Sequence, residues 1–219
     1  MRSTIKVLAA GAAAATVALS LSACGSDSTA NAADVPAGPV ANISNLQGEK
    51  TEVILDQSFL DGLKSLKLTP GVLGKATLKS GTLAFPITGG AATYYTPGTR
   101  EPYVESTIFH DGSGISLSDG KTTVELTDFV VDAGQSLLYG DVSANGKSVV
   151  HDTPLFILNG ATLEPLKVDK SAGTAVLYGT KVGLTDGAAK LLDQTYKTDA
   201  LKENFPIGTA RITLKLPQS

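Results

Sequence analysis

The chain has 219 residues, with 18 basic and 21 acidic side chains and a formal net charge of −3. A mildly acidic chain lacks the basic surface that nucleic-acid binding requires, so that class of function is excluded. A single cysteine excludes an intramolecular disulfide, and the absence of tryptophan, with 5% aromatic residues, leaves little material for a carbohydrate-stacking surface.

Residues 1–23 have the pattern of an export signal. Arg2 and Lys6 precede an apolar stretch at 7–21, which is shorter than the roughly 20 residues of a spanning helix. The following LSAC resembles the bacterial lipobox, in which the cysteine becomes the lipid-modified N-terminus after cleavage. We therefore expect a lipoprotein held through Cys24 on the outward-facing side of the cell membrane. The alternative is an ordinary signal peptide followed by a free thiol.

The remaining chain divides into a tether and one folded domain. Residues 24–50 are rich in small and polar side chains, which predicts a flexible tether. Residues 51–219 contain many short alternating apolar runs separated by Gly, Pro, Asn and Asp. In ARITLKL (210–216) every second residue is apolar, and Asn145-Gly146 is a hairpin signal. The prediction is a mainly β, single domain: an antiparallel β-sandwich or flattened barrel with two short helices.

The two helices are predicted from apolar residues at helical spacing behind capping residues. SFLDGLKSL (58–66) follows Asp56, whose side chain can cap a helix, and Pro70-Gly71 stops the run. DGAAKLLDQTY (186–196) follows Thr185 in the same way. Both helices are expected to pack one apolar stripe on the sheet.

The stretch STIFHDGSGISLSDG (106–120) contains His110, one of only two histidines. A catalytic base is the least favoured role, because a nucleophile elbow needs glycines two residues before and two residues after the serine, where Ser113 has Asp111 and Ile115. The simplest interpretation is a strand, a Gly/Asp-rich turn and a second strand. His110-Asp111 and His151-Asp152 are two His-Asp pairs that could hold a divalent ion, but turn-forming aspartates explain them better, and no metal site is expected.

The segment TYYTPGTREPY (93–103) is the clearest candidate contact surface. Tyr94, Tyr95 and Tyr103 flank a Pro/Gly loop that carries Arg100. Tyrosine-rich loops on a rigid scaffold make adaptable binding surfaces, here for a small molecule or an envelope protein. The alternative is that these tyrosines cover one end of the core.

Five segments together resemble the HtaA-type haem-binding domain of actinobacterial surface proteins: SFLDGL, GTLAFPITGG, IFHDGSGISL, VELTDFVVD and VGLTDGAAKLL. The resemblance spans most of residues 53–192 and implies a β-rich sandwich with short helices, used in haem capture at the cell envelope. In that family a Ser-Phe-x-x-Tyr segment supplies a tyrosine that ligates haem iron, and a histidine hydrogen-bonds that tyrosine. Here Gly62 stands at the tyrosine position, whereas His110 matches the histidine.

We therefore expect an exported, lipid-anchored protein of the cell envelope that acts as a non-catalytic binding or structural module without a resident cofactor. Two alternatives stay open. One is haem or iron-compound binding, with His110 and a substitute tyrosine, Tyr94 or Tyr95, lining a pocket. The other is an envelope hydrolase with His110 or His151 as the base, which requires a serine or carboxylate partner in an open cleft with an oxyanion site.

Overall fold

The computed structural model describes residues 38–46 and 48–216. The predicted signal peptide, Cys24 and most of the predicted tether lie outside these residues. The strands are β1 (Ala41–Ile43), β2 (Gly48–Leu55), β3 (Thr69–Gly74), β4 (Thr77–Lys79), β5 (Thr82–Pro86), β6 (Gly89–Tyr94), β7 (Val104–Ser118), β8 (Thr123–Asp132), β9 (Leu137–Ala144), β10 (Lys147–Asn159), β11 (Lys167–Asp169), β12 (Thr174–Leu184) and β13 (Pro206–Lys215). The helices are α1 (Gln57–Ser65), α2 (Asp186–Tyr196) and a short 3₁₀ turn, η1 (Gly160–Thr162).

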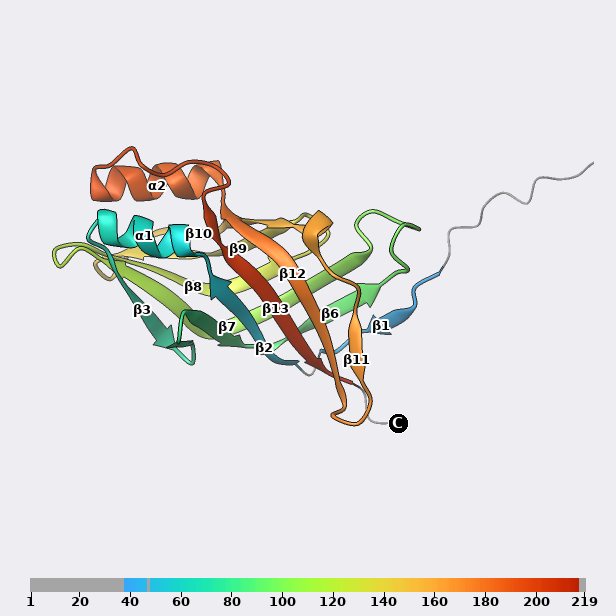
Figure 1. Ribbon diagram of the computed structural model, residues 1–219. Helices are drawn as coiled ribbons and strands as arrows, with labels where there is room; N and C mark the ends of the chain where they lie inside the picture. Colours follow the sequence, from blue (N-terminus) through green and yellow to red (C-terminus); the bar gives the residue numbers. More distant parts are fainter. Residues whose placement is uncertain (1–37, 47, 217–219) are drawn as a thin grey trace, which may run out of the picture. The chain divides into compact units, whose positions relative to one another are not determined.

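All thirteen strands belong to one antiparallel sheet, which curls so that its two halves face each other (Figure 1). The strand order is β1-β6-β7-β8-β9-β10-β12-β13-β2-β5-β4, with β3 added to β7 and β11 added to β12. Most neighbours in this order are also consecutive in sequence: turns or loops join β4 to β5 and the successive strands from β6 to β10, whereas the connection from β12 to β13 contains α2. The sheet therefore has a continuous inner face that must be covered.

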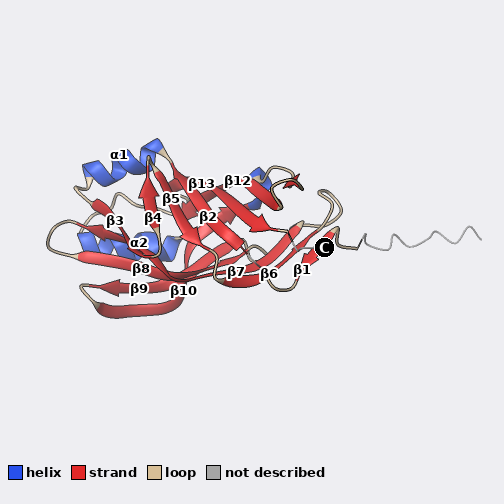
Figure 2. Cartoon of the chain, turned by 90° about the horizontal axis from the view of Figure 1, so that it is seen from below, coloured by secondary structure: helices blue, strands red, loops and turns tan. Residues whose placement is uncertain are grey.

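Both long helices lie at the same end of the sheet, and β1 lies at the opposite end (Figures 1 and 2). Leu63 of α1 and Ala189 and Leu192 of α2 are buried in the main apolar core, together with sheet residues such as Leu126 and Phe156. A smaller apolar cluster, formed by Leu46, Ile108, Val131 and Leu214, lies apart from the helices. The helices thus fill only part of the space inside the curl.

The structure confirms a mainly β fold with two helices, in the form of a single curled sheet. Asp56 caps α1 by accepting from the Ser58 amide, and Thr185 caps α2 by accepting from the Ala188 amide. Asn145 and Gly146 join β9 to β10 with φ angles of 51° and 74°, as a tight hairpin turn requires.

Two features differ from the sequence-based expectation. First, β1 and the start of β2 fall within residues 24–50, because β1 pairs with β6 at the edge of the sheet. Second, the turn predicted within 106–120 is wrong: β7 runs through it as one strand. Its pairing with β8 shifts between His110 and Gly114, where Gly112 has φ 68° and its amide donates to Asp128 Oδ1. Since β7 and β8 stay paired on both sides of Gly112 and Asp128, the irregularity there is a β-bulge within one strand and not a turn between two.

Within 38–46 and 48–216, no helix has the length and apolar character needed to cross a membrane.

Candidate functional site: an apolar cavity inside the curled sheet

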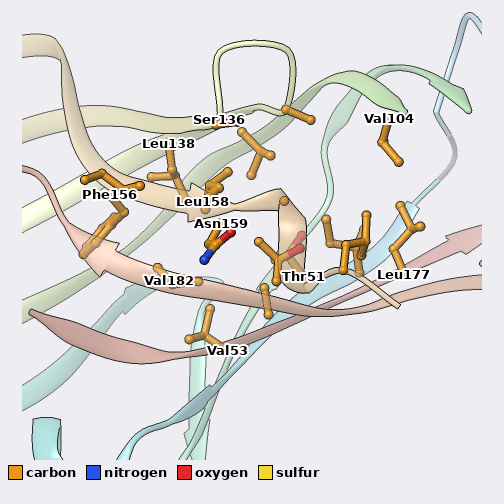
Figure 3. Close-up of a pocket in the computed structure, with 18 of the residues that line it drawn as sticks. Thr51, Val53, Val104, Ser136, Leu138, Phe156, Leu158, Asn159, Leu177 and Val182 are labelled. Carbon is orange, nitrogen blue, oxygen red and sulfur yellow. The ribbon is translucent and has the colours of Figure 1, made fainter. Parts of the chain in front are cut away.

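A cavity of about 520 Å³ lies inside the curl of the sheet. Its walls come from β2, β5, β7, β8, β9, β10, β12 and β13, and none of its lining residues belongs to α1 or α2. Figure 3 shows apolar side chains converging on this space from opposite sides. Among them are Val53, Leu138, Phe156, Leu158, Leu177 and Val182.

The period of two along each strand explains why these walls are apolar. In β2, Thr51 and Val53 line the cavity, whereas Glu52 between them faces outward and forms ion pairs with Lys50 and Arg211. Successive side chains of a strand point to opposite faces, so the alternating sequence coats the inner face with apolar groups. The alternation predicted for 210–216 has the same effect, since the neighbours of Arg211 on either side line the cavity.

The polar groups of the cavity are few and almost all uncharged. Thr51, Ser106, Ser136, Asn159 and Thr180 contribute hydroxyl or amide groups. Among the residues that the structure describes, the lining contains one carboxylate, on the exposed Glu101, and no lysine, arginine or histidine. Neither a cation nor an imidazole is therefore available to a molecule inside.

Two tyrosines brace the cavity wall at the segment that precedes β11. The Tyr103 hydroxyl donates to the Leu163 carbonyl at 2.9 Å, and the Tyr94 hydroxyl accepts from the Leu166 amide at 3.4 Å. The two rings meet edge to face with centroids 5.9 Å apart. Burial raises the pKa of the Tyr103 phenol, so the neutral, donating form is favoured. These contacts tie the end of β6 and the residue before β7 to a segment 72 and 60 residues further along the chain.

The structure thus separates the residues predicted as one tyrosine-rich surface. Tyr103 lines the cavity, and Tyr94 packs against Tyr103 without lining it. Tyr95 and Arg100 form a different cluster, in which the guanidinium lies 4.6 Å from the centre of the Tyr95 ring and pairs with Glu105. This second cluster orders the exposed loop between β6 and β7.

His110 is buried elsewhere in β7, with 1% of its surface exposed. Its Nδ1 lies 3.0 Å from the Pro86 carbonyl, and its ring centroid is 6.2 Å from that of Phe85. A carbonyl only accepts, so Nδ1 carries the proton, and Nε2 has no partner among the described residues. Tyr94 pairs with Val104, which precedes His110 by six residues on β7. The backbone positions of Tyr94 and His110 are therefore roughly 20 Å apart along the strand.

His151 is exposed and belongs to a hydrogen-bonded chain on the outer surface. Its Nδ1 lies 2.7 Å from Asp141 Oδ2, and its Nε2 lies 2.8 Å from the Ser148 hydroxyl. This order of groups is that of a Ser-His-Asp triad, but the neighbouring cavity of about 270 Å³ is lined by Val149 and Val150 and by none of the three. None of these three side chains lines the cavities of about 520, 40 and 270 Å³ found in the described residues.

Asp141 also accepts from the Asp152 amide, and these two bonds lower the pKa of its carboxyl group. The second His-Asp pair thus stabilises a bulge in β10, where Asp152 has φ 46°. Within the part of the chain that the structure describes, no three His, Cys, Asp or Glu side chains are grouped as a metal site would require.

Of the residues that line the cavity, the sequence pointed only to Tyr103, and as part of a contact loop rather than of a cavity, whereas His110, Tyr94 and Tyr95, the predicted pocket residues, do not line it. The sequence contains little that marks the other lining residues, because an apolar residue on the inner face of a strand gives the same pattern whether it packs on a neighbour or borders a cavity. Only the alternation in strands such as β2 and β13 marks the correct face.

Comparison of the sequence with protein-family profiles and with curated proteins gives no match. Solved structures do match. The C-terminal domain of HtaA from Corynebacterium glutamicum aligns with a TM-score of 0.54 and 14% identity, over 80% of this chain and 99% of that one. This likeness shows a shared fold. The N-terminal domain of HtaA aligns with a TM-score of 0.49 and 14% identity (79% and 99% covered), and the heme-binding protein HtaB from the same organism with 0.40 and 10% (80% and 96%).

The burial of His110 predicts that the free energy of unfolding depends on pH. Burial lowers the pKa of the His110 imidazole below its ordinary value of 6.5, although the Pro86 carbonyl and the Asp111 carboxylate oppose this shift. The unfolded chain therefore binds a proton more readily, and stability falls as the pH decreases from about 7 towards 5. We expect His110→Asn, which can still donate to Pro86, to flatten this decrease in urea-unfolding measurements.

The matched control is Val168→Asn, at a non-titrating side chain of β11 that is 50% exposed. It should leave the pH dependence between about 7 and 5 close to that of the native chain. The carboxylates with lowered pKa, such as Asp56 and Asp141, change the free energy of unfolding only at lower pH, near and below their ordinary pKa of 3.8. An equal slope in native and His110→Asn proteins would contradict the assignment.

Proposed function

We propose that the domain is a non-catalytic binding protein that holds an apolar small molecule in the cavity of the curled sheet. The observation that carries this proposal is the cavity itself, with a volume of about 520 Å³ and predominantly apolar walls. Protein interiors are close-packed and contain few voids larger than one water molecule, so a space of this size is no packing defect. Its volume falls in the range of about 300–1,000 Å³ that is typical of ligand pockets.

The chemistry of the lining supports binding without catalysis. Its hydroxyl groups, on Thr51, Tyr103, Ser106, Ser136 and Thr180, have no lysine or histidine beside them among the described lining residues to act as a general base. The one carboxylate, Glu101, is exposed. The residues around the cavity can therefore enclose and orient a molecule, but they offer no activated nucleophile.

Obstructing the cavity should abolish binding without unfolding the domain. Val53 lies on the cavity wall, and Val53→Phe directs a larger side chain into the open space (Figure 3). We expect the full chain to bind the uncharged fluorophore N-phenyl-1-naphthylamine saturably, and Val53→Phe to weaken this binding at least about tenfold, or about 1.4 kcal/mol. Fluorescence titration measures the affinity, and thermal unfolding verifies the fold.

The control is Val168→Phe, the same substitution at a side chain on β11 that is 50% exposed and outside the cavity. Its affinity should equal that of the native chain. Absence of saturable binding by the native chain, or equal binding by both variants, would overturn the proposal.

Haem is the second candidate ligand, supported by the resemblance of five sequence segments to HtaA-type domains and by the fold shared with the C-terminal domain of HtaA. The residues present do not fit ligation of its iron. Gly62 replaces the family tyrosine, and a Cβ added there would lie 3.0 Å from the Phe205 ring. His110 is enclosed against Phe85, and Tyr103, the phenol in the lining, is held neutral by burial.

A titration with ferric haem distinguishes the two candidates. Without an ionised phenol or an imidazole in the cavity lining, we expect no saturable shift of the Soret band, and the same spectrum in the native chain and in His110→Ala. The exposed His151→Ala serves as the control for a histidine that binds haem adventitiously. A saturable shift that is lost in His110→Ala and retained in His151→Ala would establish haem as the ligand.

We also propose that the protein is anchored outside the cell membrane by a lipid on Cys24, which the LSAC motif and the preceding apolar stretch support. Cells fed an alkyne analogue of palmitate should label the native chain but not Cys24→Ala, and the variant should be lost from the membrane fraction. Ser26→Ala, next to the motif, should remain labelled and bound. Persistent labelling of Cys24→Ala would contradict the anchor.

A further inference from the structure

The cavity is not only apolar but also nearly free of charge. No lysine, arginine or histidine lines it, and Glu101 is an exposed residue of the loop between β6 and β7. Enclosing a charged group in such a space is costly unless an opposite charge or several hydrogen bonds compensate it. The carboxylate of a fatty acid would find no cation in this lining.

One buried hydroxyl group on the cavity wall has no partner. Thr51 is 5% exposed, and its Oγ1 makes no hydrogen bond within the described residues. Buried polar groups are nearly always hydrogen-bonded, and this hydroxyl is an exception. A molecule bound in the cavity can supply the partner that it lacks. Neighbouring wall residues such as Phe85 and Ile212, which pair with Thr51 in the sheet, are apolar.

A second uncharged polar group lies at the exposed edge of the cavity. Asn159 ends β10 and lines the cavity, and its Oδ1 accepts from the Ala161 amide. This bond orients the side chain and leaves its NH₂ group for another acceptor. Figure 3 shows Asn159 and Thr51 together among the side chains that border the space.

We propose that the cavity selects an electrically neutral amphiphile, with a long apolar body against the walls and an uncharged hydroxyl or carbonyl group hydrogen-bonded to Thr51. Long-chain alcohols and neutral glycerides have this chemistry. The inference rests on the proposed binding function and gives it a ligand class. Thr51 supplies the buried polar contact, and Asn159 offers a second one at the edge.

The test compares molecules that share one chain length and differ in the head group. Displacement of N-phenyl-1-naphthylamine from the full chain is measured with 1-dodecanol, dodecanoate, dodecyltrimethylammonium and dodecane. We expect 1-dodecanol to compete at a concentration roughly tenfold or more below that of either ion. Equal or better competition by dodecanoate or by the ammonium ion would overturn the inference while leaving the binding function intact.

Thr51→Val tests the position of the polar group, because valine has the same shape without the hydroxyl. Removing an unpaired hydroxyl leaves the fold intact, so a change in binding reports on the contact. We expect the affinity for 1-dodecanol to fall roughly tenfold, to that for dodecane, while the affinity for dodecane stays unchanged. Thr107→Val, at an exposed threonine of β7 outside the cavity, is the control and should change neither affinity.

The outcomes distinguish a failure of the binding function from a failure of the ligand class or of the contact assigned to Thr51. If the native chain binds neither the fluorophore nor any dodecyl compound, the binding function itself fails and the ligand class fails with it. If all compounds bind and Thr51→Val weakens 1-dodecanol no more than dodecane, the binding function stands and the assignment of Thr51 is wrong.

Discussion

The continuous pairing of thirteen strands in one curled sheet is the constraint on which the rest of the structure depends. Each strand alternates between two faces, so the curl gathers one apolar face of every strand into a common interior. At one end α1 and α2 pack on that interior and leave smaller spaces, of about 40 Å³ between the two helices and the sheet and about 270 Å³ beside α2. Beyond the helices no helix or strand of residues 38–46 and 48–216 is inserted, and the facing walls leave a cavity of about 520 Å³.

The fold and the site bear differently on function. The fold is shared with the C-terminal domain of HtaA, but a fold hosts many functions, and the function lies in the side chains of the site. In this chain His110 is 1% exposed and is enclosed by neighbours such as Phe85. The open space is lined instead by neutral groups, which favours an uncharged ligand over a metal-bearing one.

Identical residue types have different roles here because their surroundings differ. His110 and His151 each precede an aspartate in sequence, yet one ring is 1% exposed and keeps a neutral form, and the other lies on the surface between Asp141 and Ser148. Among the tyrosines, Tyr103 braces a cavity wall, whereas Tyr95 stacks on Arg100 at the surface. Sequence neighbours cannot reveal this difference, because burial depends on strands that are distant in the chain.

The sequence by itself determined the elements whose causes are local. Asp56 and Thr185 cap their helices through side-chain bonds within three residues, and Asn145-Gly146 turns the chain because both residues accept positive φ. Only the tertiary structure decided that β7 passes through Gly112 as a bulge, since its continuity depends on β8. The cavity is also a tertiary property: it exists because the helices cover one end of the curl and not the other, which no local pattern encodes.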